Sequence, residues 1–360
     1  MVICFDCQAR SKDLLDKLVA SGGYKDYSEA LASAIENLSV LQSHVLERGS
    51  LVLSAAERRG RRTSTTVSED GAGKVERRLF RLEGLPRTAE ALADMPSDDW
   101  PSGDDVPLDR WIFGQYNRLL PAKASCRALA HLLAKEPKGI PLKEVAEKIA
   151  DEARLLGNQL KQHDEEHGIE RDDALSTGFP IAGSAWTQAN PIARYANHFV
   201  GHVSKGKLSG LLADVKLINL TGDDPLRVRL TSAGWHFAVL PNPVLDTRQE
   251  HPREKFSAEE IAFLLDHVRD HVPVERFAYR TILTAIDHGA YTPETLDSAL
   301  QGKYLDRTGP RAYSKAFLSS QRSGAVSRMA DLCLVARIRN GTKVTYNLLK
   351  GGAAFLAEIT

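Results

Sequence analysis

The sequence predicts a mainly α-helical protein with small β-sheets, and three observations lead to that prediction. Residues 1–45 alternate apolar and polar side chains over one short strand and then turn to helical periodicity. From residue 122 onward, most apolar residues recur at helical spacing. In addition, the segment LLADVKLI at residues 211–218 is matched by RMADLCLV at residues 328–335. We therefore expect a small N-terminal module followed by two similar modules.

Both copies of the repeated segment are followed by the same succession of patterns. A polar turn and a β-rich stretch lead to LTSAGWHF at residues 230–237 in the first copy and to LLKGGAAF at residues 348–355 in the second. The pattern predicts, in each copy, a helix that ends in the apolar step, two strands joined by a polar tip, and a further helix beginning near a glycine.

Length and composition limit the class of protein. A chain of 360 residues suits two or three domains, and 42% hydrophobic with 26% charged residues is typical of globular proteins. No apolar run approaches the roughly 18 residues of a membrane span, and the N-terminus lacks the pattern of a secretory signal. Four scattered cysteines do not suggest a disulfide framework. We therefore expect a cytoplasmic protein without membrane association.

Charge is distributed unevenly, although the chain as a whole has a net charge of zero. Residues 303–360 contain ten basic side chains and three acidic ones, so the rest of the chain is net negative. Such asymmetry favours a polyanion-binding C-terminal part.

The N-terminal module is predicted to contain one strand and two helices. Because about 40 residues cannot bury a sufficient core, the module must pair with another copy. The strand, the two helices and the turn GGYKDYSEAL resemble the ribbon-helix-helix family (CopG, Arc and MetJ-like) over roughly the first 43 residues. The resemblance implies a homodimer formed through the N-terminal ribbon. Whether this ribbon also contacts DNA stays open, because the acidic Asp6 would face the phosphates. The predicted dimerisation residues are Ile3, Phe5, Cys7, Leu31, Ile35 and Leu38.

Residues 46–121 are interpreted as a linker or mobile charged arm, with order expected to return at its end, where Trp111, Phe113, Tyr116, Leu119 and Leu120 indicate a packed entry to the next domain. Their periodicity is poor, and they contain Gly, Ser, Thr and Pro together with one basic and one acidic block. Two hypotheses are compatible with this composition: a solvated tether, or an arm that lies along phosphates.

Two larger domains are predicted after this arm, at residues 122–246 and 247–360. Helical patterns divide equally between them, with the segment NPVLDTRQEHPREK as the joint. The predicted helices are Ser125 to Ala134, Leu142 to His163, Pro191 to Val203, Ser257 to His271, Val274 to His288 and Pro293 to Gln301.

Both repeats resemble winged-helix regulators of the MarR, PadR and ArsR kind. In those regulators the second helix of a helix-turn-helix enters the major groove, and a β-hairpin wing contacts the flanking backbone. The resemblance implies double-stranded DNA as the partner. By position, it assigns DNA contact to Lys205, Lys207, Arg227 and Arg229 in the first copy, and to Gln321, Arg322, Ser323, Ser327, Arg328, Arg337, Arg339, Asn340 and Lys343 in the second.

Charge makes the two copies unequal. Asp223 and Asp224 at the tip of the first wing would repel phosphate, so the first copy is expected to contact either DNA or protein. The second copy has the tip NGTK and a basic helix before it. Arg can pair bidentately with guanine and Lys neutralises phosphate, so the second copy is expected to be the main DNA-binding element.

Patterns that could indicate a metal or an active site are weak. Three histidine pairs have i, i+4 spacing (His163 with His167, His198 with His202, His267 with His271), and HDEEH at residues 163–167 fits an inverted zincin pattern. Each is also what an ordinary helix surface contains. No phosphate-binding glycine loop or nucleophile motif is present. We expect no enzyme activity, no cofactor and no metal.

The sequence therefore predicts a dimeric, sequence-preferring DNA-binding protein that acts as a transcriptional regulator. A replication-initiator, partition or nucleoid-organising protein is a second hypothesis, because tandem winged helices would serve there as well. A third hypothesis, from another class, is a protein-interaction scaffold whose winged helices contact protein.

Overall fold

The computed structural model describes residue 16 and residues 78–97, 106–181, 191–204, 206–222, 226–247, 254–305 and 313–360. The chain divides into two compact units, residues 1–73 and 74–360, and all described residues except residue 16 belong to the second. The ribbon-helix-helix module stays a prediction. Its dimerisation residues Ile3, Phe5, Cys7, Leu31, Ile35 and Leu38 all lie outside the described residues.

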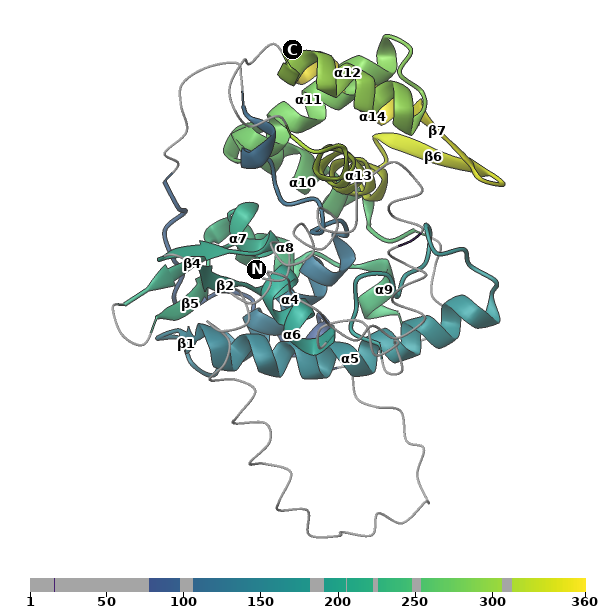
Figure 1. The fold of residues 1–360 in the computed structure, drawn as a ribbon. Helices are drawn as coiled ribbons and strands as arrows, with labels where there is room; N and C mark the ends of the chain where they lie inside the picture. Colours follow the sequence, from purple (N-terminus) through teal and green to yellow (C-terminus); the bar gives the residue numbers. More distant parts are fainter. Residues whose placement is uncertain are drawn as a thin grey trace, which may run out of the picture. The chain divides into compact units, whose positions relative to one another are not determined.

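Residues 74–360 are mainly helical with small antiparallel sheets, which confirms the predicted class at this level (Figure 1). The α-helices are α4 (Leu120–Leu133), α5 (Leu142–Glu166), α6 (Pro191–Tyr195), α7 (Leu211–Asp214), α8 (Ser232–Val239), α9 (Pro243–Asp246), α10 (Ala258–His271), α11 (Pro273–Asp287), α12 (Pro293–Leu305), α13 (Lys315–Asp331) and α14 (Lys350–Ile359). Short 3-10 helices are η2 (Arg78–Phe80) and η3 (Leu108–Arg110), and η4 (Ala196–Val200) is a π-helix. None of the described helices has the length and apolar character needed to cross a membrane.

The strands form three small sheets. They are β1 (Ile140–Pro141), β2 (His202–Ser204), β3 (Lys207–Ser209), β4 (Ile218–Thr221), β5 (Arg227–Leu230), β6 (Val335–Asn340) and β7 (Lys343–Leu348). One antiparallel sheet has the order β1-β5-β4, β2 pairs with β3, and β6 pairs with β7. The expected pair of strands after each repeated segment is thus present as β4–β5 and β6–β7.

Local sequence signals explain where several helices begin. At the start of α10, the Ser257 hydroxyl accepts a hydrogen bond from the Glu260 amide, and the Glu260 carboxylate accepts one from the Ser257 amide. Thr231 caps α8 by accepting a hydrogen bond from the Gly234 amide. In α4 and α11 a proline lies in the first turn, where no intrahelical hydrogen bond is lost.

The two copies of the repeated segment bend in the same way. Lys216 and Cys333 occupy corresponding positions, and among the described residues they are the non-glycine residues with positive φ, 57° and 55°. The next residue in each copy, Leu217 or Leu334, donates its amide hydrogen to a carbonyl five positions earlier, at 2.8 and 2.9 Å. The sequence repeat is therefore also a repeat of backbone geometry.

The glycine that closes each copy is required by a close approach. A Cβ atom on Gly234 would lie 1.9 Å from the Leu217 carbonyl oxygen, and one on Gly352 would lie 2.2 Å from that of Leu334. Both distances are far below van der Waals contact, so no larger residue fits at either position without displacement of the backbone.

Part of the predicted charged arm belongs to the folded unit. Leu108, Trp111 and Leu119 are at most 6% exposed and contribute to the core. Within the predicted linker, residues 78–97 and 106–121 thus pack against the helices, the second of these at the place where the sequence indicates a packed entry to the next domain. The apolar residues of this segment follow no regular period, because they lie on turns and short 3-10 helices.

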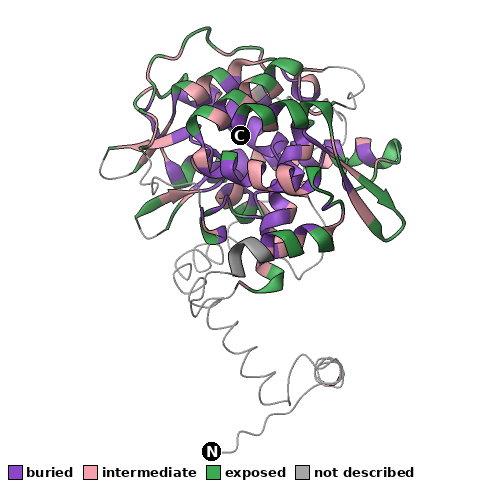
Figure 2. Ribbon diagram, turned by 90° about the horizontal axis from the view of Figure 1, so that it is seen from above, coloured by how far each residue is buried: buried purple, intermediate pink, exposed green. Residues whose placement is uncertain are grey.

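One core is shared across the predicted boundary at residues 246 and 247. Lys123 Nζ of α4 lies 2.9 Å from Glu260 Oε1 of α10, and both side chains are fully buried. The Asp331 carboxylate of α13 accepts a hydrogen bond from the Leu119 amide at 3.0 Å. Figure 2 shows buried residues throughout the interior of this unit, with exposed residues on its periphery.

Candidate nucleic-acid interface

Helix α13 carries most of the residues for which DNA contact is predicted in the second copy. Gln321, Gly324, Arg328 and Asp331 lie three or four positions apart and therefore on one face of this helix. We call this face the outer stripe, because it is the face that a winged helix would present to DNA. All four residues are buried, and they are covered by residues 108–119 of the same chain, which we call the covering segment.

The covering segment runs along α13 in close contact. The Gly114 amide donates a hydrogen bond to the Gln321 side-chain oxygen. A Cβ atom on Gly324 would lie 2.3 Å from the Gly114 carbonyl oxygen, so the two backbones touch. Further along, the Leu119 amide donates to Asp331. Since backbone groups of the segment are satisfied by side chains of the helix, the contact is a specific docking and not a loose overlay.

Arg328 lies at the centre of the outer stripe. It is 1% exposed, and its Nε and Nη2 atoms donate to the two carboxylate oxygens of Glu275 at 2.6 and 3.0 Å. Its Nη1 atom donates to the Tyr116 carbonyl oxygen at 2.7 Å. All three donating nitrogens are thus used inside the protein, and none reaches a DNA base.

The other basic residue in the middle of α13 is also engaged. Arg322 donates to the Asp297 carboxylate at 2.6 Å and to the Tyr346 hydroxyl at 2.7 Å, and it is 6% exposed. Ser327 is buried as well, whereas Ser323 is partly exposed. Of the residues predicted to contact DNA, Gln321, Arg322, Ser327 and Arg328 are buried. For the two arginines and the glutamine, the physical reason is that carboxylates, carbonyls and a hydroxyl elsewhere in the chain already satisfy their donors.

One carboxyl group of the first copy, that of Asp214, is influenced by charges from the other half of the folded unit. Burial raises the pKa of Asp214, the last residue of α7, to about 7; Lys207 and Arg328 oppose this shift, and Glu275 adds to it. Burial, and to a smaller extent Asp214, also raise the pKa of Tyr116 to about 12. The junction of α7, α13 and the covering segment is therefore an environment that disfavours further negative charge.

In the first copy, the helix predicted at Pro191 to Val203 ends at Val200. Residues 191–200 are helical as α6 and η4, and the β2–β3 hairpin follows before α7. Lys207 is exposed on β3 instead of on a helix, and Lys205 lies outside the described residues. At the base of the hairpin, a Cβ atom on Gly210 would lie 2.9 Å from the Gly201 Cα atom. The two glycines thus permit the narrow neck from which this hairpin emerges.

The arginines of the first wing are only partly available. Arg227 Nη1 donates to the Gly139 carbonyl oxygen at 2.7 Å, so this side chain braces β5 against the turn before β1. Arg229 is half-buried, and its Nε atom is buried without a hydrogen-bond partner among the described residues. Asp223 and Asp224 of the wing tip lie outside the described residues.

The β6–β7 hairpin, by contrast, presents an open polar face. Its strands pair from Val335 with Leu348 to Asn340 with Lys343, and Gly341 takes φ +62° at the first turn position. A positive φ there is what a type II′ hairpin turn requires. Side chains alternate between faces, so that one face is formed by Ala336, Ile338, Asn340, Lys343, Thr345 and Asn347. We call this the open face, because Ile338, Asn340, Lys343 and Asn347 are exposed.

The opposite face of the hairpin contains Arg337 and Arg339. Both donate hydrogen bonds to the carboxylate of Asp172, which lies in the loop after α5. The hairpin is therefore held from one side, and its open face points away from that contact. Figure 1 shows β6 and β7 extending beyond the neighbouring helices.

Three residues of the β6–β7 hairpin and its contact with the loop after α5 were not among the predicted DNA contacts: Asp172, Thr345 and Asn347. Asp172 has no sequence signal, because its partners are 165 and 167 positions away. Thr345 and Asn347 could have been predicted from the turn. With Gly341 and Thr342 at the tip, Asn340 pairs with Lys343, and Thr345 and Asn347 then lie on the same face as Lys343 because side chains alternate along the strand.

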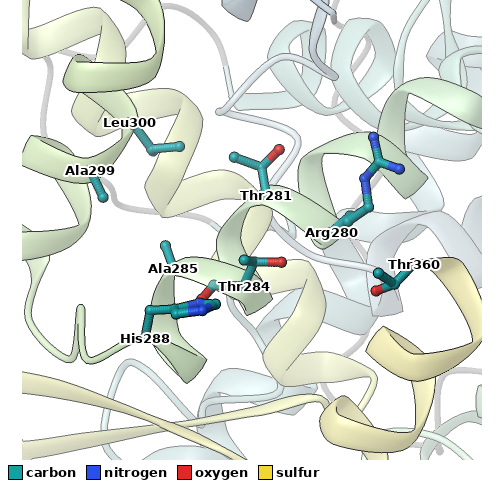
Figure 3. A pocket seen from close by; sticks show the side chains of 8 residues that line it. All are labelled: Arg280, Thr281, Thr284, Ala285, His288, Ala299, Leu300 and Thr360. Carbon is teal, nitrogen blue, oxygen red and sulfur yellow. The ribbon is translucent and has the colours of Figure 1, made fainter. Parts of the chain in front are cut away.

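A cavity of about 420 Å³ lies between α11 and α12 beside the end of α14 (Figure 3). Its lining consists of Arg280, Thr281, Thr284, Ala285, His288, Ala299, Leu300 and Thr360. The His288 Nδ1 atom lies 2.7 Å from the Thr284 carbonyl oxygen of its own helix. The lining contains neither a carboxylate side chain nor a thiol, and the open face of β6–β7 is therefore the stronger candidate site.

Two of the three histidine pairs engage in ring contacts. The rings of His163 and His167 stack with centroids 4.2 Å apart, and those of His267 and His271 are 5.4 Å apart. His267 is buried against the Val215 carbonyl oxygen, and burial lowers its pKa. Within the described residues, no group of three or more His, Cys, Asp or Glu side chains is placed to hold a metal ion.

Comparison with known proteins gave no match to a family model, to a curated protein or to a solved structure. A functional proposal for this chain therefore rests on its own geometry and charge.

Proposed function

We propose that this chain is a sequence-preferring double-stranded DNA-binding protein that acts as a transcriptional regulator, with the open face of β6–β7 as its main contact. The observation that carries this proposal is a projecting two-stranded ribbon with Asn340, Lys343 and Asn347 exposed on one face. A two-stranded ribbon fits the major groove of B-DNA, where Asn can pair bidentately with adenine. Lys343 would neutralise a phosphate at the groove edge.

The order of elements supports two winged helices. In the first copy, α4, β1, α5, α7, β4 and β5 occur in this order, with α6, η4 and the β2–β3 hairpin inserted between α5 and α7, and β5 lies between β1 and β4 in the sheet. In the second copy, α11, α12, α13, β6 and β7 have the same order. The Tyr346 amide of β7 donates to the Tyr291 carbonyl oxygen at 2.7 Å, where a third strand would pair. This succession resembles that of winged-helix domains.

The predicted homodimer would present two ribbons to one duplex. Pairing through residues 1–45 raises the effective concentration of the second ribbon once the first is bound. The excess of basic residues in residues 303–360 favours the same end of the chain as the DNA-binding part.

The test is a titration of the full chain with duplex DNA over a salt series. The triple variant N340A/K343A/N347A is expected to bind at least tenfold more weakly, since one good base contact contributes about 1–3 kcal/mol. The slope of log K against log salt should fall by about 1 for the lost phosphate contact of Lys343.

The control for this titration is K148A, which removes one exposed positive charge from α5. It should bind like the unmodified chain. If the triple variant, still folded by circular dichroism, binds as tightly as K148A, the open face does not contact DNA. If the unmodified chain binds DNA, footprinting on genomic DNA distinguishes the possible roles. Sites at promoters indicate regulation, and other distributions indicate replication, partition or nucleoid organisation.

A second function, a protein-interaction scaffold, is favoured by one observation. The outer stripe of α13, which a winged helix would present to DNA, is engaged by protein in the form of the covering segment. No measurable duplex binding by the full chain at low salt would support this function over the first.

A further inference from the structure

Three arginines converge on Asp172. Its Oδ1 atom accepts from Arg337 Nη1 at 3.0 Å, and its Oδ2 atom accepts from Nε and Nη2 of Arg339 at 3.1 and 3.0 Å. Arg118 Nη2 donates to the backbone carbonyl oxygen of Asp172 at 3.0 Å. The Asp172 carboxylate is thus shared by two guanidinium groups. The Arg118 bond fixes the backbone independently of the side chain, and Arg118 Nη1 lies 3.9 Å from a second carboxylate, that of Asp331.

The donors at this point exceed the acceptors. The Nε atoms of Arg337 and Arg118 are buried and have no hydrogen-bond acceptor within the described part of the chain. A buried donor without a partner is destabilising, so this site is incompletely satisfied. A phosphodiester group offers oxygens around a tetrahedral centre, which arginine forks bind well. The site is therefore built for an anion with more acceptors than one carboxylate.

We propose that Asp172 takes the place of a DNA phosphate in the free protein, and that Arg337 and Arg339 exchange it for a backbone phosphate when the ribbon engages the duplex. This inference rests on the proposed function.

Exposure makes the exchange feasible. The side chain of Arg339 is 43% exposed and that of Asp172 is 22% exposed, so an incoming phosphate can reach the pair from solvent. Ion pairs at such positions contribute little to stability, and a multiply charged duplex can replace them. Because Arg118 holds the backbone of Asp172, the carboxylate can swing out without displacement of the loop.

The experiment compares D172N with D173N in the same DNA titration. Asp173 is an adjacent exposed carboxylate, so D173N removes the same charge without touching the arginines. D172N is expected to bind duplex roughly fivefold more tightly than D173N. In D172N, Arg337 and Arg339 no longer have to break an ion pair with a carboxylate before they bind a phosphate. The slope of log K against log salt should also become steeper by about 1.

A double-mutant cycle completes the test. In the background R337A/R339A, which itself should weaken binding, D172N should have no further effect. Equal affinities of D172N and D173N, or weaker binding by D172N, would overturn the proposal, the second result showing that Asp172 orients the ribbon. These outcomes leave the proposed function intact as long as N340A/K343A/N347A still loses affinity; absence of binding by the unmodified chain contradicts the proposed function itself.

Discussion

Arg328 illustrates how a single partner decides what a basic residue does. On a helix after a turn, an exposed arginine would be a candidate for pairing with guanine. Here Glu275 binds it bidentately in a fully buried position, so the charge is neutralised inside the protein. Removal of one partner of such a pair leaves an uncompensated buried charge, whereas replacement of both can be nearly neutral. Arg328 therefore helps to hold α13 in position, and its guanidinium group is not available to DNA.

Asp214 gives a prediction on pH. Its pKa is raised to about 7, mainly by burial, from an ordinary value of 3.8. At a pH between these two pKa values, the folded state keeps a proton on Asp214 that the unfolded state has released. The contribution of Asp214 to the free energy of unfolding therefore falls as pH rises from about 4 to about 7. The variant D214N lacks this titration. Relative to the unmodified chain, it should therefore gain stability over that range, by at most about 1.4 kcal/mol per pH unit.

Urea denaturation at pH 4.5, 6 and 7.5 measures this difference. D266N, at an exposed carboxylate on α10, serves as the control and should show no such trend. A constant difference between D214N and the unmodified chain across the three pH values would mean that Asp214 is ionised throughout.

At the scale of the element, the contact between α13 and the covering segment depends on two glycines. A Cβ atom on Gly324 would lie 2.3 Å from the Gly114 carbonyl oxygen. The variant G324A is therefore expected to push the segment off the helix and to destabilise the fold by roughly 1–3 kcal/mol, the usual cost of overpacking. Hydrogen exchange of residues 108–119 should increase more than that of α5.

The matched control is S323A, on the neighbouring and partly exposed position of the same helix. If G324A leaves both stability and hydrogen exchange at the level of S323A, the close backbone contact does not exist in solution.

The elements themselves were largely predictable. Helical periodicity and caps such as Ser257 predicted α10 and α11 to within two residues, and the repeated segment predicted β6–β7. The covering of α13 could not be predicted, because Gly114 and Gln321 are 207 positions apart and Gly114 carries no periodic signal. A pattern reports which face of a helix is apolar, but a stripe that contains Arg and Gln looks solvent-exposed until its partners are known.

At the scale of the whole molecule, the shared core predicts cooperative unfolding. The buried pair of Lys123 and Glu260 joins α4 to α10, and the Trp111 ring packs edge-on against Phe277 of α11 at 6.4 Å between centroids. Residues 74–360 should therefore unfold in one step in urea, although the sequence predicts a boundary at residue 247.

Tryptophan fluorescence reports on this unit alone, because all four tryptophans lie within residues 74–360. The variant W111F removes the contribution of the covering segment and W235F removes that of α8, while Trp100 and Trp186 are retained in both. Coincident midpoints in both variants are expected; midpoints that differ by more than the error would show two independently folding domains.

The bends at Lys216 and Cys333 give the molecule an internal standard. Because the two positions share a left-handed φ and the same hydrogen-bond pattern, one substitution made at each samples one backbone conformation in two surroundings. The part of the change in stability that comes from the backbone conformation is the same at Lys216 and Cys333, and it cancels when the two changes are subtracted. The remainder is the influence of the neighbourhood alone, a quantity that usually requires two different proteins and is accessible here within a single polypeptide.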